Sequence, residues 1–367
     1  MFHALRKYIP HLHYACTALL AIAAIPAIHR LHLPMHLNWR GMVVFYWVGL
    51  GSRSLLYALV FCLLALPLAQ TLAPFWVRYR KEKLRTVFAL LFLAVLSYLL
   101  PFTIAALLTT DALLIVELAE RTRIEGRLFR KKVISVFASA VYMFIGISLV
   151  MIYNDIIVAS RFPLSYDGVL NQVDMWVLGG RSVSAISHAM STVLPAKFLS
   201  FLDIAYFQMF FIQGAAFLIS AYHSSRRGLQ FAGTCLSAYY LALLIFYIWP
   251  TYGPYVYCIN HTSQYPSYLE AYAFQKTGLA SLQAVSQHRI RYLASGYYIA
   301  FPCLHVALPL IAMWFLRRWR RVFWLLAIYT VLIAFTIVIL EWHYALDIPG
   351  GIAVGALAIA LVGRERL

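Results

Sequence analysis

Residues 297–362 read YYIAFPCLHVALPLIAMWFLRRWRRVFWLLAIYTVLIAFTIVILEWHYALDIPGGIAVGALAIALV. Two long apolar runs flank the basic run 317–321, and a third apolar run follows the polar stretch 341–347. About 20 apolar residues are enough for a helix to cross a bilayer. The stretch therefore predicts three membrane spans, of which the first two form a hairpin turned at the basic run.

The composition of the whole chain agrees with a membrane location. The 367 residues carry a formal charge of +17, and 63% of them are apolar while only 12% are charged. A soluble domain has about 45–50% apolar and about 25% charged residues. So few charges cannot cover a water-facing surface of this size, which excludes a soluble enzyme and a disordered scaffold. The basic residues lie in short runs between apolar stretches, which is typical of cytoplasmic loops and argues against nucleic-acid binding.

The apolar pattern extends over most of the chain. We expect an all-α, polytopic transmembrane helix bundle of about ten spans. Residues 1–130 would form an N-terminal transmembrane bundle, and residues 131–367 would contain a six-span core. The candidate spans lie near 14–28, 54–77, 87–101, 102–119, 133–153, 201–221, 230–249, 297–316, 322–340 and 344–362.

The basic runs set the orientation of these spans. Runs rich in Lys and Arg are retained in the cytoplasm, which places both termini there. The long segments 154–200 and 250–296 then face the periplasm of a bacterial inner membrane or, in a eukaryote, the lumen of a Golgi-type membrane. The basic runs that predict this are 78–81, 127–132, 226–227 and 317–321.

Ionisable residues mark the predicted extracytoplasmic ends of the C-terminal spans. His305 lies where one span begins, and His343 and Asp347 lie where the last span begins. An ionisable residue near a span is expensive to bury and is a functional hypothesis by default. Because the start of one hairpin helix and the end of its partner share a membrane face, we expect the three side chains to converge.

The spacing of these residues suggests acid–base and nucleophilic chemistry. An i, i+4 spacing lets Asp347 accept from one ring nitrogen of His343, which leaves the other nitrogen as a nucleophile. His305 could then protonate a leaving oxygen. Pro302 and Pro349 suit the first turn of a helix, and two helix N-termini at one pocket would favour an anion such as phosphate.

A metal site is the rival interpretation, because His and Asp are also ligands. Glu341 could then act as an outer carboxylate. The five cysteines lack paired or metal-ligand spacing, which argues against a disulfide framework and a structural zinc.

At these residues the sequence resembles the type 2 phosphatidic acid phosphatase superfamily. It looks most like the branch that contains fungal inositol phosphorylceramide synthase, the aureobasidin target. That branch has a Phe-Pro-Ser-Leu-His element, matched by residues 301–305, and a His-Tyr-x-x-Asp element, matched by residues 343–347. Its proline- and aromatic-rich element is matched by residues 249–254. The resemblance covers roughly residues 130–362.

The resemblance implies phosphoester chemistry through a phosphohistidine intermediate, without a metal or other cofactor. His343 would be the nucleophile, Asp347 its orienting carboxylate and His305 the general acid. Cys303 stands where the branch has serine, so a thiol replaces one hydroxyl contact to phosphate.

Other candidates complete the predicted site. The phosphatase element Lys…Arg-Pro is absent, as is the Ser-Arg pair ahead of the second His, which favours transfer over hydrolysis. Arg289 and Arg291 are candidates for binding the phosphate, because Arg makes bidentate contacts to it. The alternative, that both are ordinary interfacial cations binding lipid headgroups, is the commoner role of such residues. Tyr252 and Trp342 could line the pocket, although aromatics at span ends are usually anchors.

These observations predict an integral membrane phosphotransferase. It would move a phosphorylated headgroup, such as phosphoinositol, from a phospholipid donor to a lipid acceptor on the extracytoplasmic side. A phosphatase for phosphatidate or a polyprenyl diphosphate is the alternative enzyme, and a non-catalytic transporter or assembly protein is the alternative outside enzymes.

Overall fold

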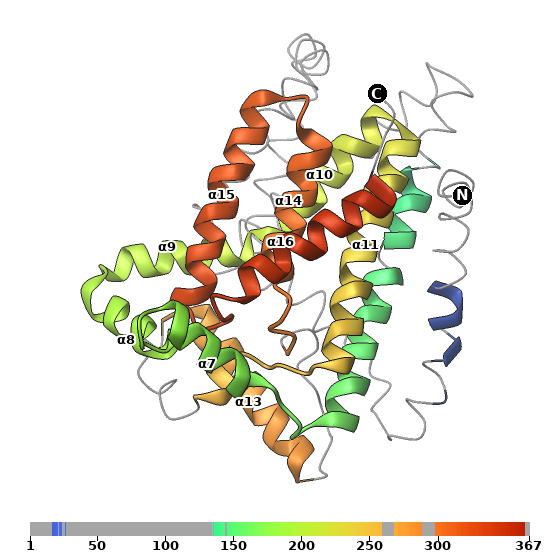
Figure 1. Ribbon diagram of the computed structural model, residues 1–367. Coiled ribbons are helices and arrows are strands. Elements are labelled where there is room, and N and C mark those ends of the chain that lie inside the picture. The colour runs from blue at the N-terminus through green and yellow to red at the C-terminus, as the bar shows by residue number, and fades with distance from the viewer. Residues whose placement is uncertain are drawn as a thin grey trace, which may run out of the picture. The chain divides into compact units, whose positions relative to one another are not determined.

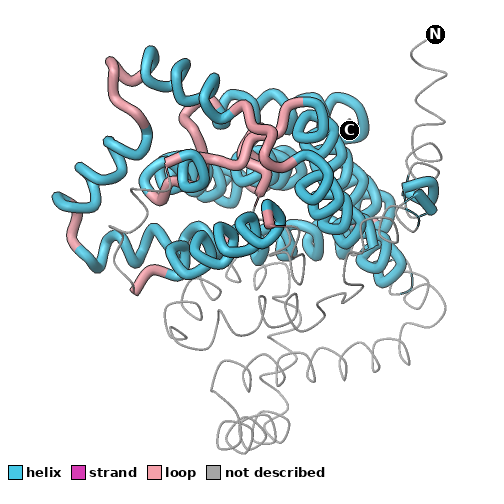
Figure 2. Tube along the Cα trace, turned by 90° about the horizontal axis from the view of Figure 1, so that it is seen from below, coloured by secondary structure: helices cyan, strands magenta, loops and turns pink. Residues whose placement is uncertain are grey.

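The computed structural model of the protein consists of helices joined by loops (Figure 1). It describes residues 17–20, 22–23, 26, 134, 136–143, 145–258, 268–287 and 298–363. Within that part of the chain there is no strand (Figure 2). The predicted all-α class is confirmed for these residues.

The helices follow one another as the apolar pattern requires. After the helical residues 17–20, 22–23 and 26, a long helix spans Val136–Arg161. It is followed by α7 (Asp167–Val177), α8 (Val183–Val193), α9 (Ala196–Phe207), α10 (Met209–His223), α11 (Ser225–Ile248), α12 (Pro254–Tyr257), α13 (Glu270–Ser286), α14 (Leu304–Leu316), α15 (Arg320–Ile339) and α16 (Asp347–Ala358), with the π-helical turn Ile359–Gly363 at its end.

Four stretches among the described residues are long and apolar enough to cross a membrane. They are Val136–Arg161, Ala196–Ala221, Arg226–Ile248 and Arg320–Ile339. The helices Leu304–Leu316 and Asp347–Gly363 are apolar but shorter. A membrane protein is therefore supported, whereas the total of about ten spans and the six-span core stay predictions. The predicted spans between 54 and 119, and the domain boundary near 130, lie outside the described residues.

The outer face of α15 has the chemistry expected of a lipid contact. Ile328 and Val331 are 66% and 72% exposed, and Trp324 is 56% exposed on the same helix. A contiguous apolar face of this kind is unusual on a water-soluble surface. In a bilayer it contacts acyl chains.

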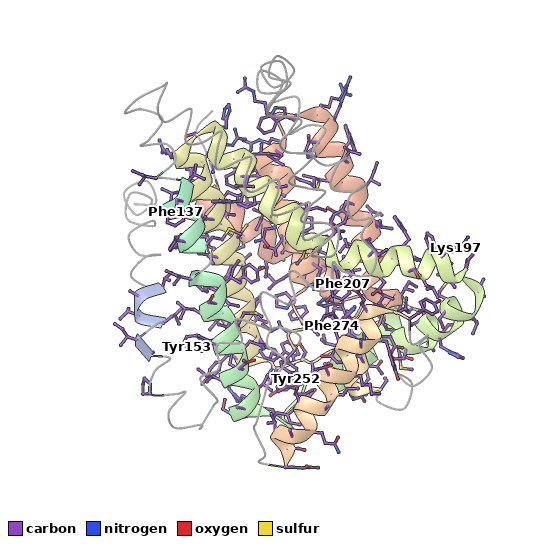
Figure 3. All side chains as sticks on the ribbon, turned by 180° about the vertical axis from the view of Figure 1, so that it is seen from behind. Phe137, Tyr153, Lys197, Phe207, Tyr252 and Phe274 are labelled. Carbon is purple, nitrogen blue, oxygen red and sulfur yellow. The ribbon has the colours of Figure 1, made fainter. Side chains whose placement is uncertain are left out.

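The two long segments that the sequence places outside the membrane contain helices of their own. Segment 154–200 contains α7 and α8, and segment 250–296 contains α12 and α13. The carboxylate of Asp203 on α9 accepts from the backbone amides of Glu270 (2.7 Å) and Ala271 (3.0 Å), at the start of α13. Phe207 and Phe274, whose rings lie 5.2 Å apart, pack the same two helices together (Figure 3).

α14 occupies the centre of the C-terminal helices and packs against α10, α11, α15 and α16. Its contact with α16 is especially close at Gly351, where a Cβ would collide with the Cys303 carbonyl oxygen, and at Gly355, where a Cβ would lie 3.1 Å from the Ala307 carbonyl oxygen. Small residues four apart let two membrane helices approach this closely. This packing places the beginning of α16 directly beside the beginning of α14.

Candidate active site

The predicted catalytic residues lie at one end of the α14–α15 hairpin, opposite its basic turn (Figure 1). Cys303 is the N-cap of α14, and α16 begins at Asp347. The Cys303 amide donates to the Asp347 carbonyl oxygen (3.2 Å), which joins the two helix starts. The convergence expected from topology is therefore present.

The two imidazoles contact each other directly. Nδ1 of His305 lies 3.1 Å from Nε2 of His343. On the other side of the His343 ring, Nδ1 lies 3.1 Å from Oδ2 of Asp347 and 2.7 Å from the Ala300 carbonyl oxygen. The same carboxylate oxygen accepts the amide of Tyr344 at 2.9 Å. The structure thus brings His305, His343 and Asp347 into one hydrogen-bonded chain.

These contacts determine which His343 nitrogen can react. A backbone carbonyl oxygen only accepts hydrogen bonds, so Nδ1 carries the hydrogen that it donates to Ala300 and Asp347. The lone pair of the neutral ring is then on Nε2, facing His305. Burial lowers the pKa of His343, but its contacts with Cys303 and Asp347 raise the pKa by more, and the net shift is upward.

An aromatic stack restricts the plane of the His305 ring. Tyr206 of α9 stacks on His305 with ring centroids 4.4 Å apart, and its other side stacks on Trp342 at 5.1 Å. Tyr206 and Trp342 are both buried. Trp342 thus approaches the site through Tyr206, a residue for which the sequence offers no signal, because it lies inside an ordinary apolar span.

Two aspartates of α7 hold the loops around the site. Asp174 accepts the amides of Ala345 (2.6 Å) and Leu346 (2.9 Å), between the predicted nucleophile and its carboxylate partner. Asp167 accepts the amides of Tyr252 and Gly253 at 2.8–3.1 Å. Burial raises the pKa of both carboxyl groups, and the donated amides lower it in part.

Sequence reasoning missed these two aspartates. Their only signal was an acidic residue in a long extracytoplasmic segment, and such a residue is most often solvated.

Gly253 has φ +100°, a conformation that favours glycine, and a Cβ there would lie 2.8 Å from the Trp342 carbonyl oxygen. The 249–254 element therefore lies against the loop that carries His343.

The helix starts supply fewer anion-binding amides than the two prolines predict. Pro302 precedes the Cys303 N-cap and so lies outside the first turn of α14, whereas Pro349 lies within the first turn of α16. The amides of Asp347 and Ile348 already donate to the carbonyl oxygens of the turn before α16. The expectation of two open helix N-termini is wrong for α16, because its first turn continues a tight turn that satisfies those amides.

The remaining predicted residues are distributed differently. Tyr252 is buried, and its ring packs edge-on against Phe162 (5.4 Å) and Phe246 (5.6 Å) instead of contacting the histidines. Arg289 and Arg291 lie outside the described residues, so the predicted phosphate-binding cations stay a prediction. Cys303 lies beside the two histidines, and these three residues could together hold a metal ion.

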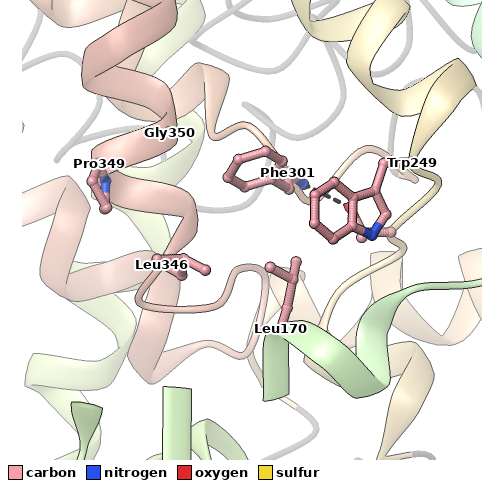
Figure 4. Close-up of a pocket in the computed structure, with 7 residues that line it drawn as sticks. Leu170, Trp249, Phe301, Leu346, Pro349 and Gly350 are labelled. Atoms are coloured by element: carbon pink, nitrogen blue, oxygen red, sulfur yellow. Dashed lines mark hydrogen bonds between the residues drawn. The ribbon is translucent and has the colours of Figure 1, made fainter. Parts of the chain in front are cut away.

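An apolar cavity of about 230 Å³ lies next to the site (Figure 4). Phe301, which lines it, lies in the loop before α14, the helix that carries His305. Leu346, which also lines it, lies in the turn that follows His343. Its other lining residues are Leu170, Trp249, Thr251, Pro349 and Gly350. The cavity offers an apolar surface within a few residues of the polar centre.

Together, the apolar all-helical fold and the His–His–Asp centre fit a class of membrane proteins that carry out phosphoester chemistry. The family model of the PAP2 superfamily matches residues 178–361, and the chain belongs to this superfamily. Membership indicates a lipid phosphatase or phosphotransferase. The match covers α8 to α16, including every residue of the His–His–Asp centre.

One curated relative is similar over a shorter stretch. It is the osmoprotective compounds uptake permease protein GgtD of Synechocystis sp., 29% identical over 131 residues. These residues make up 35% of this chain and 44% of the relative, so the chain spans less than half the length of that protein. No solved structure matches the chain.

Proposed function

We propose that the protein is an integral membrane phosphotransferase that moves a phosphorylated headgroup, such as phosphoinositol, from a phospholipid to a lipid alcohol. The observation that carries the proposal is the contact of His343 Nε2 with His305 Nδ1, with Asp347 on the opposite nitrogen of His343. The contact puts the proposed acid, His305, beside Nε2 of His343, the atom that would attack phosphorus. Transfer through a covalent intermediate requires both groups at one phosphorus.

In the first step Nε2 of His343 attacks the donor phosphorus. The bond from phosphorus to the glycerol oxygen breaks, and that oxygen takes a proton from His305, releasing diacylglycerol. Asp347 and the Ala300 carbonyl stabilise the positive charge that develops on the His343 ring.

In the second step the hydroxyl of the acceptor lipid donates its proton to His305. Its oxygen attacks the phosphorus, and the phosphorus–nitrogen bond breaks to restore His343. Water in place of the acceptor gives hydrolysis by the same steps.

The direct contact between the rings is a resting arrangement. A reacting phosphoryl group has to lie between Nε2 and the leaving oxygen, so the two ring nitrogens must separate beyond a hydrogen-bond length of about 3 Å. His305 is half-buried whereas His343 is buried, so we expect the His305 ring to move. The neighbouring apolar cavity suits the acyl chain of a lipid whose phosphate reaches the histidines.

Replacing His343 with alanine tests the proposal. With purified protein and a phospholipid labelled in its headgroup, we expect turnover to fall by at least about 10³-fold and the acid-labile label on the protein to disappear. His188→Ala, an exposed histidine of α8, should retain both. Full turnover in His343→Ala would refute the nucleophile assignment.

The products separate transfer from the hydrolytic alternative. Transfer delivers the labelled headgroup to the lipid acceptor. A phosphatase would release water-soluble inorganic phosphate from phosphatidate or a polyprenyl diphosphate.

A transport role is favoured by one observation, the partial similarity to a permease. Uptake into proteoliposomes that persists in His343→Ala would support it, because transport does not require the covalent step.

A further inference from the structure

Three possible metal ligands meet at the centre of the candidate site. Cys303, His305 and His343 each offer one ligand atom, and these atoms all lie within 4.8 Å of one another. His343 and Cys303 are buried, and His305 is half-buried. This trio exists because the chain has cysteine where the resembled element has serine.

The spacing suits a tetrahedral ion with little rearrangement. Zn²⁺ binds His nitrogen at about 2.0–2.1 Å and Cys sulfur at about 2.3 Å, so the ligand atoms around it lie roughly 3.3–3.6 Å apart. The two ring nitrogens are already 3.1 Å apart. An ion at this position would replace the hydrogen between the rings, and the fourth coordination position would stay open.

The surroundings of His343 are those of a zinc-binding histidine. Such a residue commonly donates its second ring N–H to a carboxylate or a backbone carbonyl, which fixes the tautomer that binds metal. Here Nδ1 donates to both kinds of oxygen, those of Asp347 and Ala300. On His305, the stacked Tyr206 ring restricts the plane of the imidazole.

We propose that Cys303, His305 and His343 form a Zn²⁺ site, and that the bound ion blocks the reaction centre. The bound ion occupies Nε2 of His343, the atom that would attack phosphorus. Zn²⁺ binding and turnover are then mutually exclusive. Binding stands on the geometry alone, while the inhibition rests on the proposed function.

Cobalt titration tests the binding without using activity. Adding Co²⁺ to the purified full-length protein in detergent should produce the sulfur-to-cobalt charge-transfer band, and Zn²⁺ should abolish it. The band should be lost in Cys303→Ser and retained in Cys258→Ser, which changes a half-buried cysteine outside the trio. Thermal unfolding of both variants checks that each is folded. No band in the wild-type protein, or a band that survives in folded Cys303→Ser, would overturn the site.

Inhibition of turnover is measured separately. We expect Zn²⁺ to inhibit the wild-type protein and the inhibition constant to rise at least about tenfold in Cys303→Ser, relative to that variant's own rate. A cobalt band without any lipid turnover would leave the metal site standing and defeat the proposed function. Turnover without a cobalt band would do the opposite.

Discussion

At the residue scale, the hydrogen bonds of one imidazole determine the chemistry available to the site. The Ala300 carbonyl lies 2.7 Å from Nδ1 of His343, closer than the Asp347 carboxylate at 3.1 Å. A carbonyl oxygen accepts at any pH and so fixes the tautomer of the neutral ring, whereas an ionised carboxylate also stabilises the charged ring. The two acceptors together orient the His343 ring and would stabilise the positive charge that the proposed phosphorylation places on it.

The proposed acid role of His305 predicts a dependence on the leaving group. His305→Ala should lower the transfer rate from a natural phospholipid by about 10²–10⁴-fold, because the departing alkoxide lacks a proton donor. A donor analogue with nitrophenol as its leaving group needs no proton and should lose less than about tenfold. Parallel rate measurements on the two donors check this, with His188→Ala as the control. Equal losses on both donors would mean that His305 serves binding or folding instead.

The three polar members of the site were predictable from the sequence, because helix topology alone brings hairpin ends together. Tyr206 and the Ala300 carbonyl were not predictable. The ring of Tyr206 contacts His305 only through the packing of α9 against the hairpin, and any residue has a carbonyl. Which backbone group faces a histidine depends on how the 298–303 loop folds, and periodicity says nothing about that.

At the element scale, hydrogen bonds to α7 fix the position of the loop between α15 and α16. Asp174 binds two successive amides of that loop, and Asp167 does the same for the loop after α11. Hydrogen bonds to a charged acceptor contribute about 1.5–3 kcal/mol each. The His343 loop therefore owes its position to a helix far away in the chain.

Weakening the hydrogen bonds of Asp174 to this loop should impair catalysis more than substrate binding. We expect Asp174→Asn to lower kcat by up to about 100-fold while KM changes little, since small misplacements of reacting groups have effects of that size. Steady-state kinetics on the purified variant measure both constants. Gln172→Ala, at an exposed position of α7, is the control. A rise in KM at constant kcat would assign Asp174 to substrate binding instead of positioning.

The contact between α14 and α16 should tolerate no added methyl group at Gly351. A Cβ there collides with the Cys303 backbone, and such overpacking costs about 1–3 kcal/mol. Gly351→Ala should therefore lower the unfolding temperature in detergent and also reduce turnover. Gly214→Ala in α10 has open space around its Cβ and should unfold at or above the wild-type temperature, because alanine suits a helix interior better by about 0.5–1 kcal/mol. An unchanged melting temperature for Gly351→Ala would contradict the close packing.

At the scale of the whole molecule, the helical membrane fold followed from composition and apolar run length. The exposed apolar face of α15 is what such runs require in lipid. The helices inside the long segments 154–200 and 250–296 were not predictable, because their stability comes from contacts with the spans, such as Asp203 at the start of α13. The length of α14 was also overestimated: it begins at Leu304, after the loop that positions the site, so an apolar run that starts at 297 is only partly helix.

The positive-inside pattern predicts that the site and the basic turn lie on opposite sides of the membrane. His188 lies on α8, next to Ser187, whose hydroxyl donates to the Ile339 carbonyl at the site end of α15. Arg318 lies in the turn at the other end. In a background with Cys16, Cys62 and Cys258 changed to serine, a membrane-impermeant maleimide should label His188→Cys in intact cells. It should label Arg318→Cys only after permeabilisation, and each variant's turnover verifies its fold. The reverse labelling would place the reaction on the cytoplasmic leaflet, and the donor lipid would then have to be drawn from that leaflet.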